Sequence, residues 1–153
     1  MDKRTEFMDA MKTSMKAGDS DTTNTIRLII AKMKELDIEY RGAGKGEKAP
    51  DDMLLSMMQG MIKQRQESAK IYKDNNRPEL AAKEDAEIVV INRFLPAQMD
   101  DAGIEKTVID LMAELGVTEQ KDMGKVMGAL KSRYAGQLDM GKASAMIKQK
   151  LTG

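Results

Sequence analysis

Apolar residues recur every three to four positions through most of the chain, the spacing of helices that bury one face. Four such stripes precede residue 95: Phe7, Met8, Met11 and Met15; Ile26, Ile29, Ile30 and Met33; Leu54, Met58, Met61, Ile62, Ala69 and Tyr72; and Ile88, Val89, Val90 and Ile91. Glycine, asparagine or proline interrupts the pattern at residues 18–20, 41–50 and 75–78. Valine and isoleucine rarely alternate with polar residues as they would in strands. The pattern predicts an all-α protein.

Capping residues suggest where these helices begin and end. Asp21 or Thr22 can cap the second helix, and Pro50 is well placed as the first residue of the third. The fourth is expected to run from Pro78 to about Phe94. Gly60 lies inside the third helix, where it costs about 1 kcal/mol relative to alanine. We therefore expect a neighbouring helix to approach closely at Gly60.

A second group of helices follows Pro96, because the residue before a proline is disfavoured in the α region. Asp100 can cap a helix that carries Ile104, Val108, Leu111, Met112 and Leu115 and that Gly116 terminates. Two shorter helical patterns complete the chain. The sequence thus predicts a helical N-terminal domain (residues 1–95) and a small three-helix C-terminal domain (residues 97–153).

Composition supports helices packed on helices and narrows the chemistry. Fifteen methionines accompany an aromatic content of only 3%, and methionine fills irregular space between helices. Without cysteine or histidine, the chain has no thiol nucleophile, imidazole base or common zinc ligand. We predict no catalytic residue, metal or cofactor. The start resembles no signal peptide and no run is long enough to span a membrane, so we expect a cytoplasmic location without membrane partners.

One tetrapeptide occurs twice, as Asp122-Met123-Gly124-Lys125 and as Asp139-Met140-Gly141-Lys142, each time before an apolar helical pattern. An aspartate at this position can cap the helix, while the glycine leaves backbone N–H groups uncovered beside a lysine. Although the whole chain has 25 basic and 25 acidic residues, residues 122–153 contain six basic and two acidic ones. Two interpretations stay open, namely two capped helices with surface lysines, or a surface that binds RNA phosphates.

The phosphate-binding interpretation selects ten residues from this segment. They are Asp122, Gly124, Lys125, Gly128, Lys131, Arg133, Asp139, Gly141, Lys142 and Lys148. Lys63 and Arg65 are secondary candidates, since their polar run is either a solvated face or a docking edge for RNA or for the second domain. Glu84 and Glu87 are expected to form salt bridges. Residues 41–46 are glycine-rich but follow a helix and lack the end of a P-loop, so we expect a mobile basic loop.

Several segments together resemble the GatB/YqeY family, in the same order along nearly the whole chain. They are Met15-Lys16-Ala17-Gly18-Asp19, Ile62-Lys63-Gln64-Arg65-Gln66-Glu67-Ser68, Ala82-Lys83-Glu84-Asp85-Ala86-Glu87-Ile88, Phe94-Leu95-Pro96-Ala97-Gln98, Lys121-Asp122-Met123-Gly124-Lys125-Val126-Met127-Gly128 and Asp139-Met140-Gly141-Lys142. Free-standing YqeY-like proteins are similar to the C-terminal tail of the tRNA-dependent amidotransferase B subunit, an all-helical module that helps to hold tRNA.

The resemblance implies the part that holds RNA and not the amidotransferase chemistry, because 153 residues leave no room for the catalytic cradle. It implies tRNA as a partner, or a protein of aminoacyl-tRNA synthesis or of the amidotransferase. It also places residues 122–128 in the region credited with tRNA contact, where Gly124 and Gly128 would admit a backbone or a ribose. Two alternatives stay open: a protein-interaction module with methionine-rich helical faces, and a carbon–nitrogen ligase by family association only.

Overall fold

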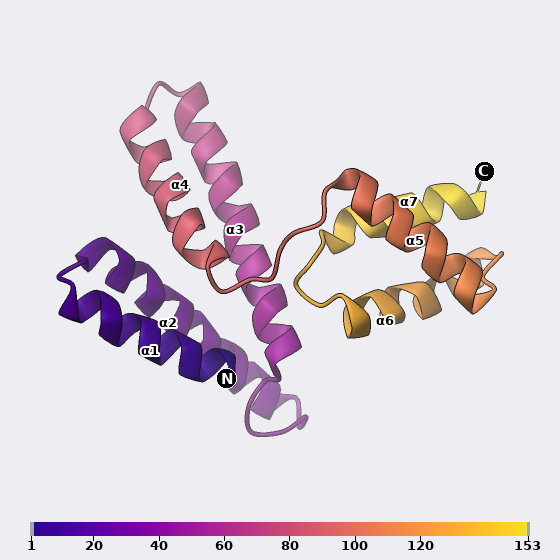
Figure 1. Cartoon of the computed structure of the whole chain (residues 1–153), viewed down its shortest axis with the longest axis horizontal. Helices are drawn as coiled ribbons and strands as arrows, with labels where there is room; N and C mark the ends of the chain where they lie inside the picture. The colour runs from indigo at the N-terminus through magenta and orange to yellow at the C-terminus, as the bar shows by residue number, and fades with distance from the viewer. Residues whose placement is uncertain (1, 153) are drawn as a thin grey trace. The chain divides into compact units, whose positions relative to one another are not determined.

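The structure is a computed structural model that describes residues 2–152 (Figure 1). Within this range it contains seven α-helices, one short 3-10 helix and no strand, which confirms the all-α prediction. The elements are α1 (Lys3–Lys16), α2 (Ser20–Gly42), α3 (Asp51–Asp74), α4 (Pro78–Asn92), α5 (Asp101–Leu115), η1 (Gln120–Asp122), α6 (Met123–Arg133) and α7 (Met140–Thr152). They form two compact units, the first ending at Leu95 and the second beginning at Pro96. That the two halves are separate folding domains stays a prediction.

The first unit consists of two helical hairpins, α1 with α2 and α3 with α4, and α2 contacts both helices of the second hairpin (Figure 1). Its core gathers the predicted stripes, and the buried members are Phe7, Ile26, Ile29, Met33, Leu54, Met58, Met61, Val90, Ile91 and Phe94. The rings of Phe7 and Phe94 meet edge to face, with centroids 5.1 Å apart and planes at 82°. Edge-to-face packing of this kind fixes the first turns of α1 against the segment that follows α4.

Several helix boundaries depart from the prediction, and α4 ends at Asn92 instead of about Phe94. The cap of α2 is Asp19, whose carboxylate accepts hydrogen bonds from the backbone N–H and the hydroxyl of Thr22. The helix continues to Gly42, so two residues of the predicted 41–50 loop are helical. Pro50 precedes α3 in an extended conformation instead of opening it. These differences are of the size by which capping signals usually misplace helix ends.

Two packing predictions for the first unit are wrong. A Cβ added to Gly60 would have no neighbour within 4 Å, so no helix approaches there. Met8 and Met15 are exposed, whereas Phe7 is buried and Met11 partly buried, so the inward face of α1 is narrower than its apolar stripe. The other described methionines are buried or partly buried. Methionine therefore serves mainly as core filling here, as its flexible side chain allows.

The second unit packs α5, α6 and α7 around a separate core, whose largest buried members are Ile104, Val108, Leu111, Val126, Leu130, Leu138 and Ile147. Both predicted ends of α5 are confirmed. The carboxylate of Asp100 accepts from the Gly103 N–H at 2.7 Å, and Gly116 adopts the left-handed conformation with φ 64°. The Met99 N–H donates to the Gln137 carbonyl at 2.7 Å, which ties the approach to α5 to the approach to α7.

Candidate nucleic-acid interface

The second copy of the repeated tetrapeptide forms the capped helix start that the sequence predicts. The Asp139 carboxylate accepts from the backbone N–H of Gly141 at 2.8 Å and from that of Lys142 at 3.2 Å. The Lys142 ammonium does not extend into solvent alone, because it donates to the Asp101 carboxylate at 2.9 Å. That hydrogen bond raises the pKa of Lys142. The Lys142 ammonium is therefore already paired with the Asp101 carboxylate of α5.

The first copy behaves differently, and its predicted aspartate cap is wrong. Asp122 precedes α6 but makes no capping hydrogen bond with its side chain. It closes the short helix η1 and has φ −93° and ψ 2°, whereas an N-cap normally needs an extended backbone. Asp100, with ψ 176°, shows the geometry that Asp122 lacks. The Asp122 carboxylate instead lies 3.7 Å from the Lys125 ammonium.

The two copies do not form one continuous pair of helix starts. Met123–Arg133 contains 11 residues, so α6 is roughly 16 Å long at about 1.5 Å per residue. The link to α7 leaves from the far end of α6 (Figure 1). The start of α7 lies instead beside the start of α5, where Lys142 meets Asp101. A ligand that touches both tetrapeptides therefore has to span about the length of α6.

The outer face of α6 is open. Gly124, Gly128 and Lys131 are spaced i, i+4 and i+7 along one side of the helix, and all three are exposed. A Cβ added at either glycine would meet nothing within 4 Å. Val126 and Leu130, on the opposite side, are fully buried. On this face the backbone is uncovered at Gly124 and Gly128, and Lys131 follows one turn further along the helix.

The remaining cations divide into paired and unpaired groups. Arg133 lies 2.8 Å from Glu114 and Lys150 lies 3.4 Å from Glu105, and both carboxylates belong to α5. The Arg133 hydrogen bond lowers the pKa of Glu114. Lys131 and Lys148 are exposed and form no ion pair with any residue between 2 and 152. These two lysines are the cations of α6 and α7 that a phosphate could approach without displacing a carboxylate.

The acidic residues that balance the cations of residues 122–153 lie in the preceding segment, residues 96–121. Residues 96–121 contain six acidic and two basic residues, the reverse of the composition of residues 122–153. The fold places carboxylates of the first segment against cations of the second. The second unit is therefore balanced in charge, and the excess of cations is local to residues 122–153.

The secondary candidates belong to the first unit. Lys63 is exposed on α3, but the Arg65 guanidinium donates to Glu87 of α4 at 2.8 Å. The side chains of Arg65 and Glu87 are only 13% and 18% exposed, and Arg65 also donates to the Met61 carbonyl. The predicted salt bridge of Glu87 is thus confirmed. Arg65 is engaged in holding α3 to α4.

Neither a metal site nor a membrane span is evident among the residues that the structure describes. Within 2–152, no group of three or more acidic side chains is arranged to hold a metal ion. None of the described helices combines the length and apolarity needed to cross a membrane.

Comparisons with known proteins give one family and two similar fungal proteins. The family described as Yqey-like protein matches residues 4–151. A relative from Vanderwaltozyma polyspora, named altered inheritance of mitochondria protein 41, mitochondrial, is 30% identical over 148 residues, covering 92% of this chain and 78% of its own length. A protein of the same name from Meyerozyma guilliermondii is 34% identical over 85 residues, covering 56% of this chain and 42% of its own. The chain therefore belongs to the YqeY-like family.

Proposed function

We propose that this protein is a non-catalytic helical module that binds the phosphate backbone of tRNA through the outer faces of α6 and α7. The observation that carries the proposal is the pair of unpaired lysines, Lys131 and Lys148, with the open Gly124–Gly128 strip beside the first of them. Phosphate contacts position a nucleic acid without reading its sequence. A strip without Cβ atoms allows the RNA backbone to approach the helix closely.

The cations that are paired with carboxylates of α5 can contribute to RNA binding only when those ion pairs open. Lys142, Lys150 and Arg133 reach phosphate only by exchanging a carboxylate of α5 for it. Exposed ion pairs contribute little to stability, so such an exchange is accessible. We therefore propose that Lys131 and Lys148 make the first contacts and that the paired cations join when an RNA strand lies along the helices.

Association with a tRNA amidotransferase belongs to the same proposal and rests on the resemblance to the tail of its B subunit. The names of the two fungal relatives refer to inheritance of mitochondria and mention no RNA. A cytoplasmic location is likewise proposed here, whereas both relatives are named as mitochondrial proteins. Ligase activity has no support from the residues: the described residues contain no group that could hold a metal ion, and residues 41–46 lack the end of a P-loop.

The test is tRNA binding measured across a salt series. Wild-type protein is compared with Lys131→Glu/Lys148→Glu and with a control, Lys12→Glu/Lys34→Glu, which makes the same charge change at exposed lysines of the first unit. Each duplex phosphate contact contributes roughly 0.9 to the slope of log affinity against log salt. We expect the first variant to bind more weakly with a slope reduced by roughly 2, and the control to resemble wild type. Equal binding by the two variants, or no binding by wild type, would refute the proposal.

A further inference from the structure

Charged residues are segregated along the exposed part of α2. Arg27, Lys34 and Arg41 follow one another at intervals of seven residues, so they form a row along one side of the helix, and all three are exposed. Ala31 and Ile38 are also exposed and lie between them on the same side, which gives an alternating spacing of four and three residues. These five residues form the basic strip of α2, which contains three cations and no carboxylate.

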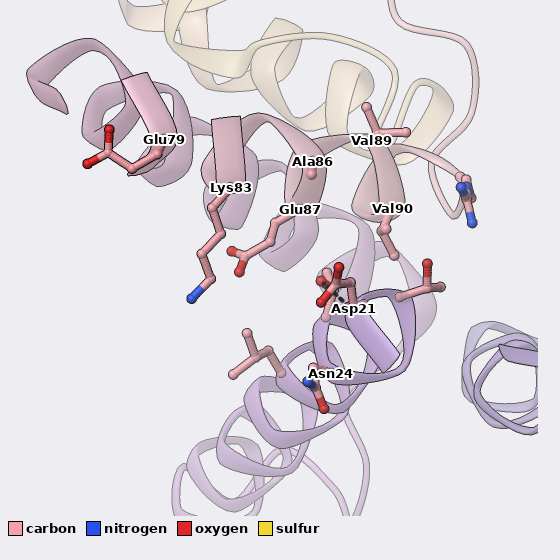
Figure 2. A pocket seen from close by; sticks show the side chains of 12 residues that line it. Asp21, Asn24, Glu79, Lys83, Ala86, Glu87, Val89 and Val90 are labelled. Carbon is pink, nitrogen blue, oxygen red and sulfur yellow. Dashed lines mark hydrogen bonds between the residues drawn. The ribbon is translucent and has the colours of Figure 1, made fainter. Parts of the chain in front are cut away.

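The exposed acidic residues of α2 lie on a different side of the helix. Asp21 lines a pocket of about 920 Å³ between α2 and α4, where carboxylates and cations are mixed (Figure 2). Glu35 follows Asp21 by two seven-residue intervals and therefore shares its side of α2, where it pairs with Lys32 at 3.3 Å. Glu39 lies one turn beyond Glu35. The side of α2 that borders α4 is thus of mixed charge, whereas the basic strip carries only positive charge.

The cations of the basic strip are largely unpaired. Arg27 and Lys34 form no ion pair with any residue between 2 and 152. Arg41 donates to a backbone carbonyl of the following loop at 3.2 Å, and its charge also acts on Asp37. Asp37 is the carboxylate that borders the strip, but it is buried and accepts both hydrogen bonds from Arg4. Two cations of the strip are therefore free, and the third is partly engaged.

Exposed apolar side chains accompany these cations. Ile38 is 61% exposed, more than any other large apolar side chain in the part of the chain that the structure describes. Met15 of α1 is 52% exposed and lines, together with Arg27, a shallow depression of about 260 Å³ between α1 and α2. Met8 precedes Met15 by seven residues on the same side of α1 and is 41% exposed. A row of cations beside exposed apolar side chains fits a partner surface that is both anionic and apolar.

We propose that the basic strip of α2, with the exposed methionines of α1 beside it, docks a helix of a partner protein that carries acidic residues at seven-residue intervals next to an apolar stripe. Alternating spacing of three and four residues is the spacing at which two packed helices meet turn after turn. Apolar side chains of the partner cover Ile38 and Met15, and its carboxylates pair with Arg27 and Lys34. Charge complementarity selects the partner and sets its orientation, while apolar contact adds affinity. This docking site is independent of the RNA contacts proposed for α6 and α7.

RNA or a membrane surface would use the strip less completely than a helix. Phosphates would pair with the cations but leave Ile38 and the methionines uncovered, and no aromatic residue belongs to the strip for bases to stack on. Helices that lie on membranes insert Trp, Phe or Leu, whereas Ala31 and Ile38 are the apolar residues between these cations. The regular spacing of seven residues matches a second helix and serves neither of the other two surfaces.

The test presents the full-length protein to a display library of helical peptides. Leucine is fixed at the a and d positions of several heptads, and the e and g positions vary freely among Glu, Lys and Gln. Binding of the selected peptides is then measured by fluorescence anisotropy. The selection is repeated on Arg27→Glu/Lys34→Glu and on its matched control, Lys63→Glu/Lys70→Glu, which reverses two exposed, unpaired lysines that are also seven residues apart on α3. Ile38→Ser is compared with Ile71→Ser, an equally exposed position of α3.

Circular dichroism establishes that all four variants remain helical. If a charge-reversed variant fails this check, the pair Arg27→Gln/Lys34→Gln and Lys63→Gln/Lys70→Gln replaces both. We expect peptides selected on wild type to be enriched in Glu at seven-residue intervals. Their affinity should fall roughly tenfold or more in Arg27→Glu/Lys34→Glu, fall in Ile38→Ser, and stay unchanged in both controls. Peptides selected on Arg27→Glu/Lys34→Glu should carry Lys where those selected on wild type carry Glu.

Absence of Glu enrichment, equal binding to strip variants and controls, or no selected peptide at all would each overturn the proposal. Titrations with tRNA and with anionic phospholipid vesicles test the other occupants. If Arg27→Glu/Lys34→Glu loses binding to either while Lys63→Glu/Lys70→Glu retains it, the occupant is RNA or a membrane and the proposal is wrong. Self-association that Arg27→Glu/Lys34→Glu abolishes would also overturn it, because a second copy of the chain would then cover the strip.

Discussion

The guanidinium of Arg4 and the carboxylate of Asp37 form a bidentate ion pair, in which both nitrogen-to-oxygen distances are 2.7 Å. The same carboxylate accepts from the Ala49 N–H at 2.9 Å, and Arg4 also donates to the Ala49 carbonyl at 2.9 Å. Side chains of α1 and α2 thereby hold the last residues of the loop that leads to α3. These contacts anchor the connection between α2 and α3 at Ala49, beyond the residues 41–46 for which a mobile loop is predicted.

Breaking this pair should destabilise the first unit markedly. Asp37→Ala leaves Arg4 without its partner at a site where the two side chains are only 21% and 11% exposed. We expect a loss of about 3 kcal/mol in the free energy of unfolding, measured with urea. Glu35→Ala removes one partner of the exposed Lys32–Glu35 pair and should cost at most about 1 kcal/mol. A comparable loss in both variants would mean that the Asp37 pair has no special role.

The same pair predicts a definite dependence of stability on pH. The hydrogen bond from Arg4 holds the pKa of Asp37 below its ordinary value of 3.8. A lowered carboxyl pKa adds stability that is fully present above the unfolded pKa and is lost as pH falls through the folded pKa. The stability difference between wild type and Asp37→Asn should therefore be constant above about pH 5 and shrink below about pH 4. Urea unfolding between pH 2 and pH 6 measures it; a difference that grows on acidification would contradict it.

Helix positions and the family were accessible from the sequence, whereas the electrostatics of the candidate site were not. The same four letters begin α6 and α7, but only Asp139 caps its helix, since η1 gives Asp122 a turn conformation. Local sequence does not reveal that difference, because it depends on the preceding turn. The basic count of residues 122–153 likewise ignored α5, whose carboxylates the tertiary fold brings against three of the cations.

The carboxylates of α5 should weaken RNA binding by competing for cations. In the variant Asp101→Asn/Glu105→Gln/Glu114→Gln, each substitution frees one partner among Lys142, Lys150 and Arg133. We expect tRNA to bind more tightly and with a steeper salt dependence, because more cations then reach phosphate.

Overall charge also changes in that variant, so the control must alter charge without freeing a cation. Asp110 lies on the same helix, is exposed and forms no ion pair with a described residue. Asp110→Asn is therefore compared with each single substitution, since every one of them removes one negative charge. A gain in tRNA affinity equal to that of Asp110→Asn would show that general charge, and not release of the paired cations, is responsible.

Substitutions at the uncovered glycines Gly60 and Gly128 can separate an effect on protein stability from an effect on RNA binding. Gly60 in α3 and Gly128 in α6 both lie inside helices, and a Cβ at either position meets nothing within 4 Å. Replacing either by alanine should stabilise the protein by about 1 kcal/mol, because glycine is the poorer helix former. Leucine, also a good helix former, should be tolerated at both positions. If RNA lies against the outer face of α6, Gly128→Leu should weaken tRNA binding while Gly60→Leu leaves it unchanged. Denaturant unfolding and tRNA titration of the four variants measure stability and binding separately. If Gly128→Leu is stable and binds tRNA as wild type does, the Gly124–Gly128 strip of α6 is not part of the RNA interface. The proposed interface would then depend on the lysines alone.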